Sequence, residues 1–166
     1  DGINISDPQS NSRWIEPNPD WFSEIQVGGV GAPAEFGSFT GGFVNGILKR
    51  GGNEVTGNFS GYYGDNKWEA ISTNSNPNFT AEAKKLPPAK DWDAAFNVGG
   101  PIIKDKLWFY VGLQYYRSKI RPAGFPEDID YKQPRAFVKM SSQFTPTLSM
   151  IASFQIDNYI GKNRGA

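Results

Sequence analysis

From residue 55 onward, apolar and polar side chains alternate along the chain, and this alternation limits the folds that it can adopt. A period of two places successive side chains on opposite faces of a β-strand, so each alternating segment predicts a strand with one apolar and one polar face. Phe137 and Ile151 break the pattern, because they fall on the polar sides of their strands. We expect five antiparallel strands, at 55–63, 92–98, 107–117, 135–144 and 148–156, with the start of a sixth beyond Gly161.

The connections between these strands alternate in length. The segments 101–106 and 145–147 are short, whereas 65–91 and 118–132 are long, polar and interrupted by prolines. Transmembrane β-barrels join their strands by short periplasmic turns and long outer loops in this order. The pattern therefore favours a barrel wall whose long connections lie outside the cell.

Three aromatic side chains agree with that orientation. Tyr63, Trp92 and Tyr115 lie on the apolar faces of the first three strands, and all three would lie at the outer end. Membrane barrels carry girdles of aromatic residues at both interfaces. Arg117 continues the same face, and we expect its long side chain to extend toward lipid head groups.

A soluble β-sandwich is the alternative, because its strands also alternate where one face packs on a second sheet. Such a module would bind carbohydrate or peptide, with Trp14, Trp21 and Trp68 as stacking groups. Sandwich strands do not need aromatic residues aligned at one rim. The loop order and the girdle therefore favour the barrel.

The composition excludes several kinds of chemistry. The chain has no cysteine and no histidine, so it can form neither a disulfide nor a Ser–His–acid set, and it has no histidine or thiol ligand for a metal. Seventeen basic and 17 acidic residues balance, which gives no sign of a nucleic-acid partner. We predict no catalytic residue, no metal site and no cofactor. The densest acidic cluster, Glu127, Asp128 and Asp130, is expected to be a solvated part of a loop.

The first 53 residues are rich in glycine and carry a set of motifs. The segments 22–27, 34–37, 40–49 and 51–54 resemble, in this order, the end of the plug domain of TonB-dependent receptors. Further along, the segment 96–109 resembles the turn between the second and third strands of the Oar-like branch. Gly46, Leu48 and Arg50 depart from the usual residues of the motif. Its characteristic positions are Glu24, Phe36, Gly37, Gly41, Gly42 and Asn45.

This resemblance implies an all-β fold that is part of a plugged transmembrane β-barrel, which in this class has 22 strands. Residues 1–53 would be the C-terminal part of the plug. Residues 54–166 would be the first barrel strands, with long outer loops at 65–91 and 118–132. Because the chain begins abruptly within a motif-like stretch, we expect it to be part of a longer polypeptide.

The resemblance also implies a function and a location. The whole protein would be a receptor of the bacterial outer membrane that takes up an unidentified ligand with energy from the TonB complex. That complex would bind a segment absent from this chain, and outer-membrane lipid would be the other partner. A structural barrel of the outer membrane without transport is the second alternative.

Three aromatic residues are candidate substrate contacts. Trp14 lies among prolines and polar residues of the plug part, where it would face either the core or the vestibule. Phe36 occupies the aromatic position of the plug motif, on the ligand side. Trp68, in the first long loop, would stack on a sugar or aromatic ligand or pack on its own loop. Trp108 and Tyr110 are expected to face the lumen and pack against the plug.

Overall fold

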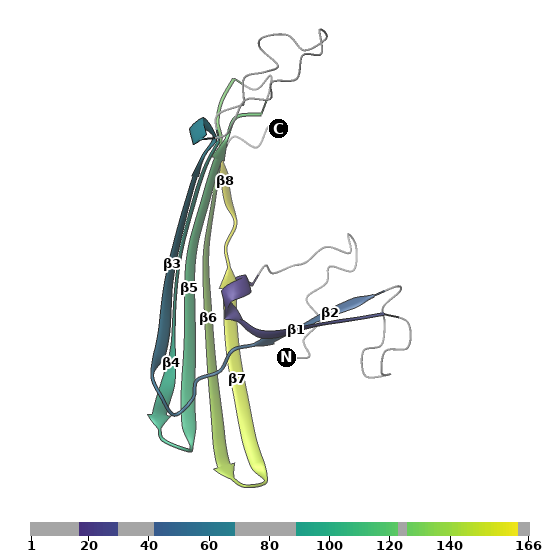
Figure 1. Ribbon diagram of the computed structural model, residues 1–166, viewed down its shortest axis with the longest axis vertical. Helices are drawn as coiled ribbons and strands as arrows, with labels where there is room; N and C mark the ends of the chain where they lie inside the picture. Colours follow the sequence, from purple (N-terminus) through teal and green to yellow (C-terminus); the bar gives the residue numbers. More distant parts are fainter. Residues whose placement is uncertain (1–16, 30–41, 69–88, 123–125, 163–166) are drawn as a thin grey trace. The chain divides into compact units, whose positions relative to one another are not determined.

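The computed structural model describes residues 17–29, 42–68, 89–122 and 126–162, and their regular structure is almost entirely β (Figure 1). Two short 3-10 elements, η1 (Pro19–Trp21) and η3 (Asn66–Trp68), accompany the strands. The strands are β1 (Phe22–Gly28), β2 (Phe43–Leu48), β3 (Thr56–Asp65), β4 (Ala89–Ile103), β5 (Leu107–Ile120), β6 (Ile129–Thr145), β7 (Leu148–Asp157) and β8 (Ile160–Lys162). Within the described ranges, no helix has the length and apolar character needed to span a bilayer.

The strands form two sheets. β1 and β2 make an antiparallel pair, and β3 to β7 form a meander in which each strand pairs with the next. β3 and β7 are the shortest strands of the meander, with 10 residues each. That length meets the ~9–11 residues that a tilted strand needs to cross a bilayer. The all-β fold and the five expected strands are confirmed.

Several strands are longer than the alternation predicts. β4 begins at Ala89 and continues through Pro101, whereas β5 runs to Ile120 and β6 begins at Ile129. At the ends that adjoin the long connections, the strands extend into segments that the sequence assigns to loops, because charged residues such as Lys119 and Lys132 replace apolar ones on the same face there. The alternation signal fades at that point although the pairing of the strands continues.

Strand β8 continues along β6 from where β7, the fifth strand of the meander, ends. Lys162 pairs with Asp130 of β6, and the Asn158 amide donates to the Pro134 carbonyl at 3.2 Å. These contacts share one antiparallel register along β6. The sixth strand expected beyond Gly161 is therefore not met within the described residues, which end at Lys162.

The exposure of the two faces is the reverse of that in a soluble sheet. Phe59 is 72% exposed and Phe154 65%, whereas Gln114 on the opposite face is only 7% exposed. Soluble sheets bury their apolar face, but a membrane barrel presents it to lipid. The arrangement favours the barrel wall over the sandwich. We call the exposed apolar face outward and the other face inward; the inward face buries Ala95, Asn97, Tyr110, Gln114, Phe137, Lys139 and Ser141.

The described residues form two compact units. The first unit contains the described residues up to Thr56 together with Gly99–Tyr110 and Val138–Ser153. Because it includes the two short turns, we call it the short-turn unit. The second unit contains the described residues within Gly57–Val98 and Val111–Phe137, and the described residues from Phe154 onward. We call it the long-connection unit, because its strand ends adjoin the long connections.

Candidate functional site

In the short-turn unit, strands β1 and β2 bring together two positions of the plug motif. Gln26 lies opposite Asn45 in the register, and the Asn45 amide donates to the Gln26 side-chain oxygen at 3.1 Å. Gln26 in turn donates to the Glu24 carboxylate at 2.8 Å. At the far end of the pair, a Cβ on Gly42 would lie 3.2 Å from the Gly28 carbonyl oxygen, so glycine permits the close approach there.

At the end of the pair where β1 begins and β2 ends, Lys49 is hydrogen-bonded to element η1. The backbone amide of Lys49 donates to the Trp21 carbonyl at 2.7 Å, and the Lys49 ammonium donates to the Asp20 carbonyl at 2.7 Å. The Asn18 side chain caps η1 by accepting from the Asp20 amide at 2.7 Å. Trp21 is fully buried, so it packs in the core and does not present the stacking surface that the sandwich alternative expects of it.

One lysine of the barrel wall holds the same end of β2. The ammonium of Lys139, on β6, donates to the Leu48 carbonyl at 3.0 Å. Lys139 is 4% exposed and belongs to the inward face of the sheet. The chain that precedes the barrel strands therefore lies against the polar, inward side of the wall.

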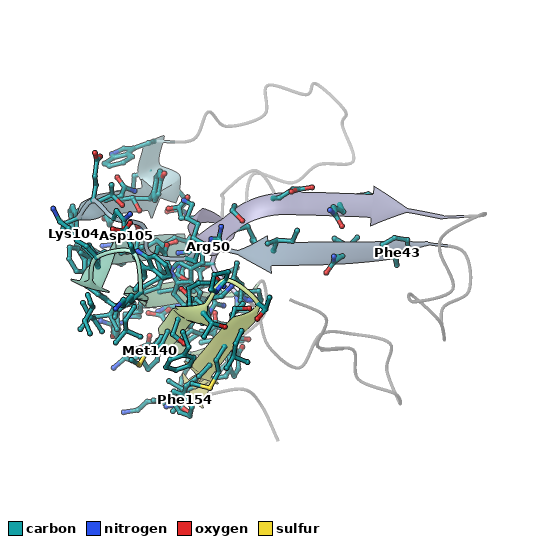
Figure 2. All side chains as sticks on the ribbon, turned by 90° about the horizontal axis from the view of Figure 1, so that it is seen from below. Phe43, Arg50, Lys104, Asp105, Met140 and Phe154 are labelled. Carbon is teal, nitrogen blue, oxygen red and sulfur yellow. The ribbon has the colours of Figure 1, made fainter. Side chains whose placement is uncertain are left out.

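The linker from β2 into β3 is packed against the first short turn. A Cβ on Gly51 would lie 2.2 Å from the Phe109 carbonyl oxygen and 2.8 Å from that of Gly100, so only glycine fits. Figure 2 shows Arg50 at the end of β2 that faces this turn, with Phe43 at the other end. A recess of about 380 Å³ lies between the linker and the inward side of β5 to β7.

The side chain of Asn53 makes three hydrogen bonds to the first short turn, between β4 and β5. Its side-chain oxygen accepts from the Asp105 amide at 3.0 Å and from the Trp108 indole at 2.7 Å, and its nitrogen donates to the Asp105 carboxylate. Asp105 has a φ of 62°, a left-handed conformation that aspartate tolerates better than most residues. Trp108 thus contacts the linker; its packing against a plug stays a prediction.

In the long-connection unit, a row of polar side chains crosses the inward face of four adjacent strands. Gln114 donates to the Asp93 carboxylate at 2.9 Å and accepts from the Arg135 guanidinium at 3.1 Å. Arg135 also donates to Asp157 at 3.3 Å and to Gln133 at 2.9 Å. The side chains of Arg135 and Asp157 are 9% and 10% exposed. A row of this kind fixes the wall while keeping its inner surface polar.

The aromatic residues of this unit form a cluster on the first two barrel strands. Tyr63 packs against Trp92 with ring centroids 4.5 Å apart and edge-on against Trp68 at 5.2 Å. Trp68, in η3, therefore packs on the preceding strand β3, and 71% of it remains exposed. Tyr115, the third girdle position, is 45% exposed. The girdle assignment and the ligand-stacking role of Trp68 both stay predictions.

Two of the three carboxylates of the acidic cluster, Asp128 and Asp130, are paired with cations and are not simply solvated. Arg117 donates to Asp130 through two nitrogens, at 2.9 and 2.7 Å, so its guanidinium is held by β6. Asp128, in the connection before β6, bonds Lys119 at 2.9 Å and Arg121 at 2.6 Å. The Lys119 ammonium and then the Arg121 guanidinium hold the pKa of the Asp128 carboxyl below its ordinary value.

Other expected site residues lie outside the described part of the chain, namely Trp14, Phe36, Gly37 and Gly41. Among the described residues, no group of three or more acidic side chains could hold a metal ion. Sequence reasoning missed Lys139, Asn53 and the row from Asp93 to Asp157. For Lys139 and the row, the available signal was a charged or amide residue at an inward position of an alternating strand, which alternation alone reports only as polar; Asn53 precedes β3 and gave no such signal.

Comparison with known proteins places these features in context. The profile of a family described as "Outer membrane beta barrel domain" matches residues 47–127. The chain is 27% identical over 113 residues to the "TonB-dependent transporter Oar" of Myxococcus xanthus, a match that covers 68% of this chain and 11% of the relative. No solved structure matches the chain. The resemblance to Oar-like TonB-dependent receptors is thereby confirmed, and the chain spans about a tenth of that relative's length.

Proposed function

We propose that this chain, part of a β-barrel of the bacterial outer membrane, is the section of a TonB-dependent receptor in which the plug joins the barrel wall. Residues 1–53 are then the C-terminal part of the plug, and residues 54–166 are the first strands of the barrel. The full-length protein binds a ligand outside the cell and imports it with energy delivered through TonB. Neither catalysis nor nucleic-acid binding forms part of this proposal.

The contact from Lys139 to Leu48 carries the proposal. It fixes the segment before the barrel strands on the inward face of the wall, and an inward-facing segment that precedes the first strand is what a plug requires. Asn53 and Gly51 then lead the chain into β3 beside the first short turn. A barrel without a plug has no need of a preceding segment held against its inner wall.

Three cultures of two strains, grown in the same rich medium, test this function. Solutes removed from the medium are compared by untargeted mass spectrometry for the parent strain, for a strain lacking the gene, and for the parent treated with a protonophore. We expect at least one solute whose removal needs both the gene and the proton gradient. The same solute identifies the ligand for direct binding measurements.

The result also separates the alternatives. A gene whose loss changes no energy-dependent uptake, but weakens the outer membrane against detergent, would support the structural barrel in place of the transporter. A full-length protein recovered from the soluble fraction without detergent would support the carbohydrate- or peptide-binding module.

A further inference from the structure

The outward face of the long-connection unit contains a furrow about 480 Å³ in volume. It forms where the small side chains of Ala94 and Ala136 lie among large ones from β3, β4 and β5. The large residues that border it include Phe59, Phe96, Leu113 and Tyr115, which are 45–72% exposed. In a bilayer such a furrow is filled, because an empty one would forfeit the dispersion contacts of its lining.

Cations gather immediately beyond one end of this furrow. Tyr115 and Pro134 border the furrow, and the next residues on the same face of their strands are Arg117 and Lys132. Two residues of a strand advance about 7 Å, which is a short step from an acyl chain to its head group. We define the cation rim as Arg117, Lys119, Arg121, Lys132 and Lys162; Lys162 belongs to it because it pairs with Asp130 across the strands.

The carboxylates of Asp128 and Asp130 orient cations of the rim without using all the N–H groups of those cations. Arg117 gives two N–H groups to Asp130, and within the described residues the other three of its guanidinium make no further hydrogen bond. Lys119 gives one bond to Asp128 and, in the part of the chain that the structure describes, has two further N–H groups for a ligand. With Glu127 included, five cations face three carboxylates, an excess of two positive charges. Charged donors held in place in this way suit a phosphate.

From the furrow and the rim together, we propose that this outward face binds one phosphate-bearing lipid of the outer leaflet, with an acyl chain in the furrow and the phosphate at Arg117 and Lys119. The cluster of Tyr63, Trp68 and Trp92 in the same unit agrees with this depth, since such rings favour the head-group level. The proposal rests on the outer-membrane location alone and holds whether or not the protein transports a ligand.

The test uses the delipidated full-length protein in nanodiscs of phosphatidylcholine, with or without bisphosphorylated lipid A. Native mass spectrometry counts the lipid A retained per protein, and the melting temperature is followed in parallel. We expect one tightly retained lipid A and a higher melting temperature. Replacing two charged donors, as in Arg117→Gln with Lys119→Gln, should weaken retention about tenfold or more.

Two matched variants isolate the two parts of the site. Lys104→Gln with Lys106→Gln removes the same charge from the short turn and should retain lipid A like the wild type. Ala136→Phe fills the furrow, keeps every cation, and should also lose lipid A. Arg117→Lys with Lys119→Arg keeps the charge and should retain most binding.

Three outcomes would overturn the proposal. The first is equal retention of lipid A by the wild type and the Arg117/Lys119 variant. The second is equal loss in the Lys104/Lys106 variant, which would mean a general charge effect. The third is a rise in melting temperature with inorganic phosphate alone as large as that with lipid A, combined with no effect of Ala136→Phe, because the rim would then bind a free anion.

Discussion

The ammonium nitrogen of Lys139 lies 3.0 Å from the carbonyl oxygen of Leu48, across 91 positions of sequence. The contact joins the last residue of β2 to the inward face of β6, where Lys139 is almost fully buried. A hydrogen bond from a charged donor contributes about 1.5–3 kcal/mol. The wall therefore restrains the end of the segment that we assign to the plug.

Replacing Lys139 with methionine should free this end of β2. Methionine keeps the apolar stem but cannot donate, so the hydrogen bond from Lys139 to the Leu48 carbonyl is lost. We expect the amides of β2 to exchange with deuterium about ten- to hundredfold faster in the full-length protein, as the loss of one such bond implies. Lys104→Met, on the exposed turn, is the control. Unchanged exchange in β2 would show that Lys139 does not hold it.

Adjacent glycines of the linker should respond differently to the same substitution. In Gly51→Ala the new Cβ would meet the carbonyl oxygens of Phe109 and Gly100 at 2.2 and 2.8 Å, whereas nothing lies within 4 Å of a Cβ on Gly52. We expect Gly51→Ala to destabilise the folded protein by about 1–3 kcal/mol, the usual cost of overpacking. Gly52→Ala should be close to neutral. Urea unfolding followed by electrophoretic mobility measures both, and equal midpoints would contradict the tight packing at Gly51.

The sequence predicted the strands well, because alternation is a local property. Each of the five alternating segments became a strand, and only the ends differed. β6 begins earlier than expected because Asp130 continues the pairing with Arg117 of β5 through charge where the apolar alternation stops. Phe137, an exception to the pattern, is 1% exposed on the inward face, so its apolar character serves packing there.

The candidate site could not be predicted to the same extent, because it depends on contacts between distant residues. Lys139 with Leu48, and Asn53 with Trp108, join positions 91 and 55 apart. Alternation identifies Lys139 only as a polar inward residue and gives no partner. Glu24 and Asn45 were expected from the plug motif, but their connection through Gln26 needs the register of β1 and β2.

The pKa of the Asp128 carboxyl provides a pH-dependent prediction. Because Lys119 and Arg121 lower this pKa in the folded protein, the pairing stabilises the connection fully above the ordinary value of 3.8. That contribution is lost as the pH falls through the lower, folded value. In selectively labelled full-length protein, the carbon NMR shift of the Asp128 carboxyl should titrate with a midpoint below 3.8. Lys119→Gln should move the midpoint upward and Lys104→Gln should not; a midpoint at or above 3.8 would count against the ion pairs.

Arg135 should contribute more to stability than Arg121, although both pair with an aspartate. The side chains of Arg135 and Asp157 are 9% and 10% exposed, whereas that of Arg121 is 46% exposed. Removing one partner of a buried pair typically costs about 3–5 kcal/mol, because the other charge is left without compensation. An exposed pair contributes about 0–1 kcal/mol, since water screens it.

The two arginines can be compared directly as Arg135→Ala and Arg121→Ala in the full-length protein. We expect the first to lower the urea midpoint strongly and the second to leave it nearly unchanged. Asp157→Asn combined with Arg135→Met removes both charges of the buried pair, and it should recover part of the lost stability because no unpaired charge remains. Equal midpoints for the two alanine variants would mean that the inward row is hydrated in the assembled barrel and that its charges are screened by water.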